Sequence, residues 1–264
     1  MNDTVFITKG DYVYRRLRED ILNGVFPAGT KLLIKDLSTR YSTSAMPLRN
    51  AITRLEEFGL VTSIPYVGAY VSTVNLHDYF SLMLLRIETE SVATMMATIN
   101  ANEEIIAELE QITMQMQQAA EEQNAEKYGV ANRLFHNTVY TACNNPIILA
   151  TIENFMNRTA VAVHTFGIIP QTMSISLEEH KFWLDAIRIG DVQKSVDLIR
   201  YQRCRSSLAL LNHIKLRKHS PVENDIFMQS FINDVDSETI EYFIKMFTWN
   251  MKLACTQDLN QFNK

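Results

Sequence analysis

Arg86 is a cation in a stretch that is otherwise almost entirely apolar, "SLMLLRIE". A guanidinium that leaves water needs an anionic partner, because it stays charged and loses its hydration on burial. One interpretation is an ion pair with Glu88, Glu90 or another carboxylate nearby. The other is a clamp for the carboxylate of a small bound molecule. Both interpretations are compatible with the sequence.

A second set of candidate residues lies in "STSAMPLRN", residues 42–50, where a polar turn runs into an amphipathic helix. Ser44 is expected to cap that helix, and Pro47 is tolerated in its first turn because no N–H is needed there. Met46 and Arg49 would then lie at the start of the helix. A guanidinium in this position can donate to a guanine edge or bind a phosphate.

Three helices and a hairpin are predicted around this segment. Apolar residues spaced by three or four positions predict helices over 11–23, 34–41 and 46–58, and "LVTSIPYVGAYVST" predicts two short strands around "PYVG". This is the order of a winged helix-turn-helix, whose third helix enters the major groove of DNA. Lys35 would suit a phosphate, and Gly68 at the hairpin tip would let the backbone approach the duplex. The alternative is a helical domain with one capped helix and a chance hairpin.

The remainder of the chain predicts a mainly α fold. Six helices with short connections indicate an antiparallel helical bundle, and they are expected over residues 76–99, 102–123, 126–143, 147–166, 174–189 and 191–212. Another helix is expected over 237–254, after a loop. The predicted domains are 1–74, 76–212 and a C-terminal extension, 213–264.

Charge and cysteine usage narrow the class of protein. The net charge is −5, but residues 1–74 carry +2 and the rest carries −7, as expected if only the first domain meets phosphate. Cys143, Cys204 and Cys255 form no CxxC pair, which is typical of a reducing compartment. No signal peptide and no long apolar run is found, so the sequence predicts a cytoplasmic protein without a membrane segment.

The first domain resembles the winged-helix head of GntR-type bacterial transcription regulators. The residues that carry the resemblance are "ILNGVFPAGTKL", "LSTRYSTSAMPLRNAITRLEEFGLV" and "GAYV", and it covers 11–74 almost without gaps. The resemblance implies that Lys35, Ser44, Met46, Arg49 and Gly68 meet double-stranded operator DNA.

Three residues depart from the family's pattern. Ala45 replaces the first recognition arginine, Asn50 replaces the glutamate that follows Arg49, and Val67 replaces a polar or basic residue before the wing glycine. Each lost bidentate contact to guanine removes roughly 1–3 kcal/mol of discrimination. The operator sequence is therefore expected to differ from those of relatives that keep the arginine.

The second domain resembles the all-helical, FCD-type ligand-binding domain of the FadR-like branch of that family. The matching residues are "LRIETES", "NRLFHNTVYTACNNPII" and "EEHKFWLDAIRIGDVQKSVDLIRYQRCRSSL". Many relatives bind a divalent metal there, through an aspartate four residues before a histidine and two later histidines. The matching positions are Asn132, His136, His180 and Gln202.

Two of these four positions are amides, which bind zinc or nickel weakly. His136 and His180 are therefore candidate metal ligands in a poor site. The alternative is a neutral hydrogen-bonding pocket that includes Asn132 and Gln202. His164, in "AVAVHTF", is an outside candidate for a further ligand, although a histidine on an apolar face more often belongs to the core.

These observations together predict a ligand-responsive, DNA-binding transcription regulator. The resemblance implies a bundle that senses a small organic or sugar acid, with Arg86 on the carboxylate, and we expect a repressor. A homodimer is expected because two half-sites about one helical turn apart need two heads. An enzyme is not expected, because the chain has no Ser/His/Asp set, no HExxH and no Gly-rich phosphate loop. A helical metal-dependent enzyme built on His136 and His180, and an interaction module with a degenerate DNA-binding head, are the alternatives.

Overall fold

The computed structural model describes residues 8–73, 75–166, 173–218 and 236–254, without the side chains of 160–166 and 217–218. These residues form two compact units, and each is described by itself. The first unit contains the described residues of 1–79 together with those of 153–168. The second contains the described residues of 80–152 and of 169–264. His164 lies outside the described side chains, so its prediction as a ligand is not tested.

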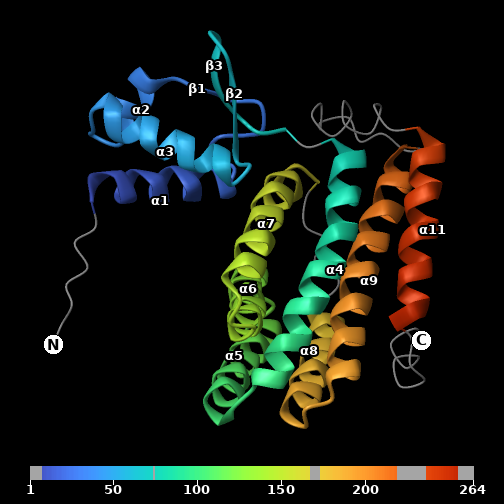
Figure 1. Ribbon diagram of the computed structural model, residues 1–264. Helices are drawn as coiled ribbons and strands as arrows, with labels where there is room; N and C mark the ends of the chain where they lie inside the picture. Colours follow the sequence, from blue (N-terminus) through green and yellow to red (C-terminus); the bar gives the residue numbers. More distant parts are fainter. Residues whose placement is uncertain (1–7, 74, 167–172, 219–235, 255–264) are drawn as a thin grey trace, which may run out of the picture. The chain divides into compact units, whose positions relative to one another are not determined.

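Within the first unit, residues 8–73 form three helices and a small antiparallel sheet (Figure 1). Its helices are α1 (Lys9–Leu22), α2 (Ile34–Arg40) and α3 (Ala45–Glu57), and its strands are β1 (Lys31–Leu32), β2 (Val61–Ile64) and β3 (Gly68–Val71). The strand order is β1-β3-β2, so the predicted hairpin is present with one extra strand. Two residues are too few to show the alternation that identifies a strand in a sequence.

One apolar core holds this domain together. The spacing that predicted the helices places one stripe of each helix inward, and the core consists of Val13, Leu17, Ile21, Leu37, Leu48, Leu55, Leu60 and Val71 with their neighbours. A buried carboxylate links α1 to the end of α2. Asp20 accepts hydrogen bonds from Arg40 Nε at 2.9 Å and from the Tyr41 hydroxyl at 2.7 Å.

The rest of the chain forms long helices. Their bounds are α4 (Leu76–Asn100), α5 (Glu103–Glu121), α6 (Ala125–Ala142), α7 (Pro146–Phe166), α8 (Met173–Arg188) and α9 (Val192–Lys218). Residues 76–79 of α4 and 153–166 of α7 belong to the first unit, and the other residues of these helices belong to the second. Helix α5 packs against α6 and α8, and α8 packs against α9. Among the described residues, no helix combines the length and the apolar character that crossing a membrane requires.

Two features of the bundle differ from prediction or extend it. Helix α9 was expected to end at residue 212 but continues to Lys218, because no glycine or proline interrupts it and Ile214 is fully buried. A C-terminal helix, α11 (Ser237–Ala254), has the predicted bounds and packs along α9 (Figure 1). Its buried Phe243 and Phe247 contact Phe80 of α4, with ring centroids 5.4 and 5.9 Å apart.

Candidate functional site

The N-terminus of α3 is open to solvent. Ser44 has the extended backbone of an N-cap residue (φ −81°, ψ 170°), but its side chain accepts no hydrogen bond from the helix. Ser44 therefore occupies the predicted N-cap position, but its side chain does not make the capping hydrogen bond. The first N–H groups of α3, which normally need a capping oxygen, remain available to an anion, and the helix dipole favours negative charge there.

Two predicted contact residues project from this end of α3. The side chain of Met46 is 67 % exposed, and Arg49 is also exposed and has no ion pair among the described residues. A second arginine of α3 is held differently. Arg54 donates to Asp11 at 2.8 Å and lies over the ring of Tyr14, 4.0 Å from its centroid. Arg49 is therefore the guanidinium of α3 that is available for an external acceptor.

Lys35 lies in the first turn of α2 with its side chain exposed, as a phosphate contact requires. The β2–β3 hairpin forms the wing, with Ile64 paired to Gly68 across its turn. Gly68 has φ +133°, a conformation that side chains rarely adopt, and an added Cβ would lie 3.2 Å from Lys31 Cε. The sequence did not single out Tyr66, which is fully exposed at the wing tip and has φ +63°.

A buried ionic network lies in the interior of the bundle. Glu90 is completely buried and accepts hydrogen bonds from Arg86 Nη2 at 2.7 Å, Arg203 Nε at 2.5 Å and the Tyr140 hydroxyl at 2.8 Å. Arg203 Nη2 also lies 3.1 Å from the Tyr140 oxygen and 3.3 Å from His136 Nδ1. The ion pair predicted for Arg86 as the alternative to a ligand clamp is therefore present, and its partner is Glu90.

The charges of this network are fixed at neutral pH. Burial alone would raise the pKa of Glu90, but the Arg203 and Arg86 guanidinium groups lower it to about 2. Burial and the charge of Arg203 hold the pKa of His136 well below its usual range, so its ring is neutral. A guanidinium only donates, so His136 Nδ1 accepts from Arg203 and the ring proton is assigned to Nε2.

A second polar group lies beside this network. His180 is fully buried, its Nδ1 lies 2.6 Å from the carbonyl oxygen of Ser176, and burial lowers its pKa to about 4. The carbonyl accepts the Nδ1 proton, which leaves a lone pair on Nε2. Gln202 donates to Glu179 at 3.3 Å, and Arg205 neutralises that carboxylate at 2.5 Å.

Two acceptor atoms of this group lack a donor. His180 Nε2 and Gln202 Oε1 are buried without a hydrogen-bond partner among the described residues. The rings of His136 and His180 contact each other edge to face, with centroids 5.1 Å apart. The structure therefore brings together three of the four positions in the predicted pocket. The fourth, Asn132, lies one turn before His136 on α6 and is half-buried.

A divalent metal does not fit these residues. His136 uses its one lone pair on Arg203, so only His180 offers an imidazole nitrogen, and Asn132 and Gln202 offer neutral amides. A guanidinium 3.3 Å from the His136 ring also repels a cation. Within the described part of the chain, no group of three or more His, Cys, Asp or Glu residues is arranged to hold a metal. The prediction of His136 and His180 as metal ligands conflicts with this arrangement.

Sequence reasoning missed Arg203, Tyr140 and Glu179. The signal for two of them was present, since Tyr140 is one helical turn from His136 and Arg203 follows Gln202. Arginines at 200, 203 and 205 have separate partners in the structure, Glu88, Glu90 and Glu179. The pairing across helices could not be predicted from spacing within one helix.

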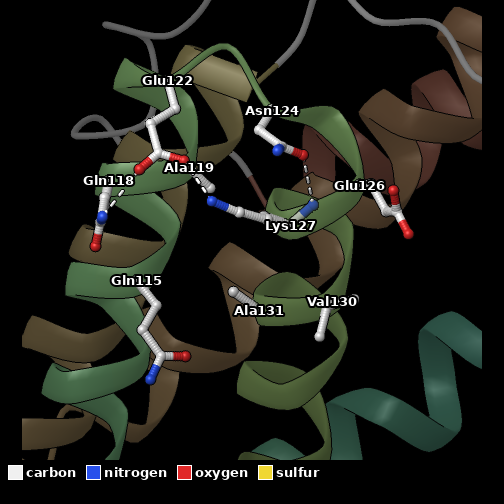
Figure 2. A pocket seen from close by; sticks show the side chains of 9 residues that line it. All are labelled: Gln115, Gln118, Ala119, Glu122, Asn124, Glu126, Lys127, Val130 and Ala131. Carbon is white, nitrogen blue, oxygen red and sulfur yellow. Dashed lines mark hydrogen bonds and ion pairs between the residues drawn. The ribbon is translucent and has the colours of Figure 1, made fainter.

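An open groove of about 550 Å³ lies between α5 and α6, and none of the residues that line it belongs to the buried network (Figure 2). Four of its polar side chains make local hydrogen bonds. Glu122 accepts from Lys127 at 2.8 Å and from Gln118 at 2.9 Å, and Asn124 accepts from the backbone N–H of residue 127 at 3.0 Å. Most of its lining is exposed, so the groove lacks the buried polar atoms of the bundle interior.

Two family models match the chain, one over each domain. Residues 9–71 match "Bacterial regulatory proteins, gntR family", and residues 81–202 match "FCD domain". The HTH-type transcriptional regulator McbR of Escherichia coli is 27 % identical over 177 residues, which cover 66 % of this chain and 80 % of McbR. The HTH-type transcriptional repressor GlaR of the same species is 20 % identical over 195 residues, 71 % of this chain and 89 % of GlaR.

Solved structures share the fold. Escherichia coli McbR/YncC superposes with a TM-score of 0.70 at 23 % identity, covering 79 % of this chain and 99 % of that chain. A GntR transcriptional regulator from Rhodococcus sp. RHA1 has a TM-score of 0.64 at 18 % identity, covering 77 % and 98 %. The expectation of a winged helix-turn-helix followed by a helical domain is therefore confirmed.

Proposed function

Because this chain belongs to the GntR family of DNA-binding transcription regulators and carries an FCD domain, we propose that it is a homodimeric repressor controlled by a small organic or sugar acid. The observation that carries the DNA-binding part is the open N-terminus of α3. There the first N–H groups have no side-chain cap, and Arg49 is exposed one turn later. A phosphate and a base edge are the groups such a helix end recognises.

The proposal of a homodimer follows from operator geometry. Regulators of this kind read two half-sites about one helical turn apart, and one head reaches only one of them. A two-fold symmetric operator would therefore match a two-fold symmetric protein. Repression is proposed because relatives such as GlaR bear the name repressor.

The proposal of an acid effector rests on the bundle interior. Arg203 is held by Glu90 and by His136 Nδ1, and beside it His180 and Gln202 each have a buried acceptor atom without a hydrogen-bond partner among the described residues. An effector acts only if it binds one arrangement of the dimer more tightly than the other. We expect ligand binding in the bundle to favour an arrangement of the two heads that does not match the operator.

Selection of genomic DNA fragments by the purified protein at physiological salt tests the DNA-binding part. The expected result is a short two-fold symmetric motif, which Arg49→Ala does not select. Arg54→Ala is the matched control, since that guanidinium is held by Asp11 and Tyr14. Failure of the native protein to enrich any motif would favour an interaction module with a degenerate head.

A further inference from the structure

The tip of the β2–β3 wing carries three exposed apolar side chains within four residues. Ile64 and Val67 are 47 % and 51 % exposed, and Tyr66 between them is completely exposed. None of the three belongs to the apolar core of this domain. Neighbouring apolar side chains that are left in solvent are typical of a contact with another molecule.

The backbone at Tyr66 is strained for a tyrosine. The N–H of Val67 donates to the Ile64 carbonyl at 3.0 Å and closes a turn with Pro65 and Tyr66 at its centre. Proline fixes its own φ near about −65°, and φ at Tyr66 is +63°, which together are the φ angles of a type II turn. Glycine or asparagine is the usual residue at the position that Tyr66 occupies. A bulky residue that stays there at a cost indicates a role outside the fold.

The wing is attached to α3 by hydrogen bonds. Glu56, in the last turn of α3, accepts from the backbone N–H of Ser63 at 3.0 Å and from its hydroxyl at 2.9 Å. Lys31 of β1 lies beside the tip, since its Nζ is 3.9 Å from the place where a Cβ of Gly68 would stand. This ammonium group is exposed and has no carboxylate partner among the described residues. A cation in this place suits a phosphate.

DNA is the molecule that this tip fits. The tip and the open end of α3 belong to one domain, and residues 9–71 match a DNA-binding family. The tip has no cation of its own for a phosphate, whereas the faces of the bases are aromatic. An aromatic ring with a cation beside it is the combination that binds both a base and the nucleic-acid backbone.

We infer that Tyr66 enters the minor groove of the operator as a wedge, stacks on a base at one step and bends the duplex. Lys31 binds a phosphate beside that step. Because stacking does not read base edges, the wing selects a step that deforms easily, such as TA or CA/TG. The inference rests on the proposed function, since the DNA is the operator of the same head.

The selection of genomic fragments tests the step preference. The motif selected by the native protein should contain a TA or CA/TG step outside the bases that Arg49 specifies. Tyr66→Asn should select the same motif without that step, because asparagine keeps the turn but has no ring to stack. Tyr66→Phe should select the native motif. A preference that Tyr66→Phe loses would indicate a hydrogen bond from the hydroxyl group and overturn the stacking.

Affinity and bending are then measured on a duplex of the selected sequence. Tyr66→Asn should bind it roughly 5- to 150-fold more weakly than the native protein, which is the loss of one stacked base, and Tyr66→Phe less than about twofold more weakly. Energy transfer between dyes at the two ends should show a bend of roughly 20–90° with the native protein and a smaller bend with Tyr66→Asn. Permanganate, which oxidises unstacked thymines, should attack the step only with the native protein and Tyr66→Phe.

Two controls separate a contact from a general loss of structure. Tyr242→Asn should leave affinity and bend unchanged, because Tyr242 is also exposed but lies on α11. Tyr66→Asn should be at least as stable to urea as the native protein, since asparagine tolerates the positive φ. A lower stability would mean that the ring supports the fold, and it would overturn its assignment as a wedge.

The outcomes distinguish this inference from the proposed function. A native protein that enriches a motif but leaves the duplex straight refutes the wedge and leaves the regulator proposal standing. Native affinity of Tyr66→Asn for the selected duplex does the same, and it would assign the tip to a partner other than DNA. A native protein that enriches no motif refutes the regulator proposal together with the inference that rests on it.

Discussion

Glu90→Gln should destabilise the helical bundle, because it removes the charge at the centre of the buried ionic network. The carboxylate has no exposed surface and accepts from Arg86, Arg203 and Tyr140. An amide of the same size keeps the volume but loses the charge that both guanidinium groups face. Breaking a buried ion pair in this way typically costs about 3–5 kcal/mol, so we expect a loss of stability of that order at pH 7.

The same substitution should also change how stability depends on pH. The pKa of Glu90 is about 2 in the folded protein, whereas an unperturbed glutamate has a pKa of 4.5. Because the folded pKa is depressed, the stabilisation is present above pH 4.5 and is lost as the pH falls toward 2. By linkage the loss is about 2 kcal/mol at pH 3 and approaches about 3 kcal/mol below pH 2. Glu90→Gln cannot show this loss.

Urea unfolding of both proteins at intervals from pH 7 to pH 3 measures the effect. The difference in unfolding free energy between native protein and variant should shrink by about 2 kcal/mol over that range, since contributions of other groups cancel. Glu88→Gln is the control, because that carboxylate is 60 % exposed and pairs with Arg200 at the surface. A difference that stays constant with pH would refute the assignment of the network.

Three further changes test the packing of the helices by urea unfolding. Ser195→Ala removes the oxygen that accepts from Trp183 Nε1 at 2.9 Å, and it should lower the free energy of unfolding by about 1–3 kcal/mol. An unchanged stability would mean that the indole N–H has another acceptor. Phe247→Ala should lower the free energy of unfolding by about 3–5 kcal/mol, because Phe247 is buried. Trp249 is exposed, so Trp249→Ala should lower it by less than about 1 kcal/mol. Equal losses would contradict the docking of α11. Gly129 lies in the interior of α6, so Gly129→Ala should raise the free energy of unfolding by about 0.5–1 kcal/mol. A lower stability would show that the added methyl group clashes with a neighbour.

Local signals were sufficient to predict most helices. Asn102 and Asn124 accept hydrogen bonds from backbone N–H groups three residues later. Asparagine is a preferred N-cap residue, so the sequence predicts where α5 and α6 begin. The end of α9 was misplaced because its stop signal is absent, and β1 was missed because it is two residues long. Helix α3 shifted by only one residue from the predicted range.

The candidate site in the bundle could be predicted only in part. His136, His180 and Gln202 were identified by resemblance, and they do lie in one buried polar region. Arg203, which fixes the charge beside these residues, lies on α9 and forms an ion pair with Glu90 of α4. Such pairing depends on how three helices face each other, and periodicity within a single helix carries no information about that.

Sequence-specific DNA binding is measured by the affinity of the purified protein for its selected operator and for a scrambled duplex of equal length. We expect a specificity ratio of at least about 10³ at physiological salt, and a fall of roughly 5- to 150-fold in that ratio for Arg49→Ala. Arg54→Ala should keep the native ratio. A ratio near one for the native protein would contradict sequence-specific DNA binding.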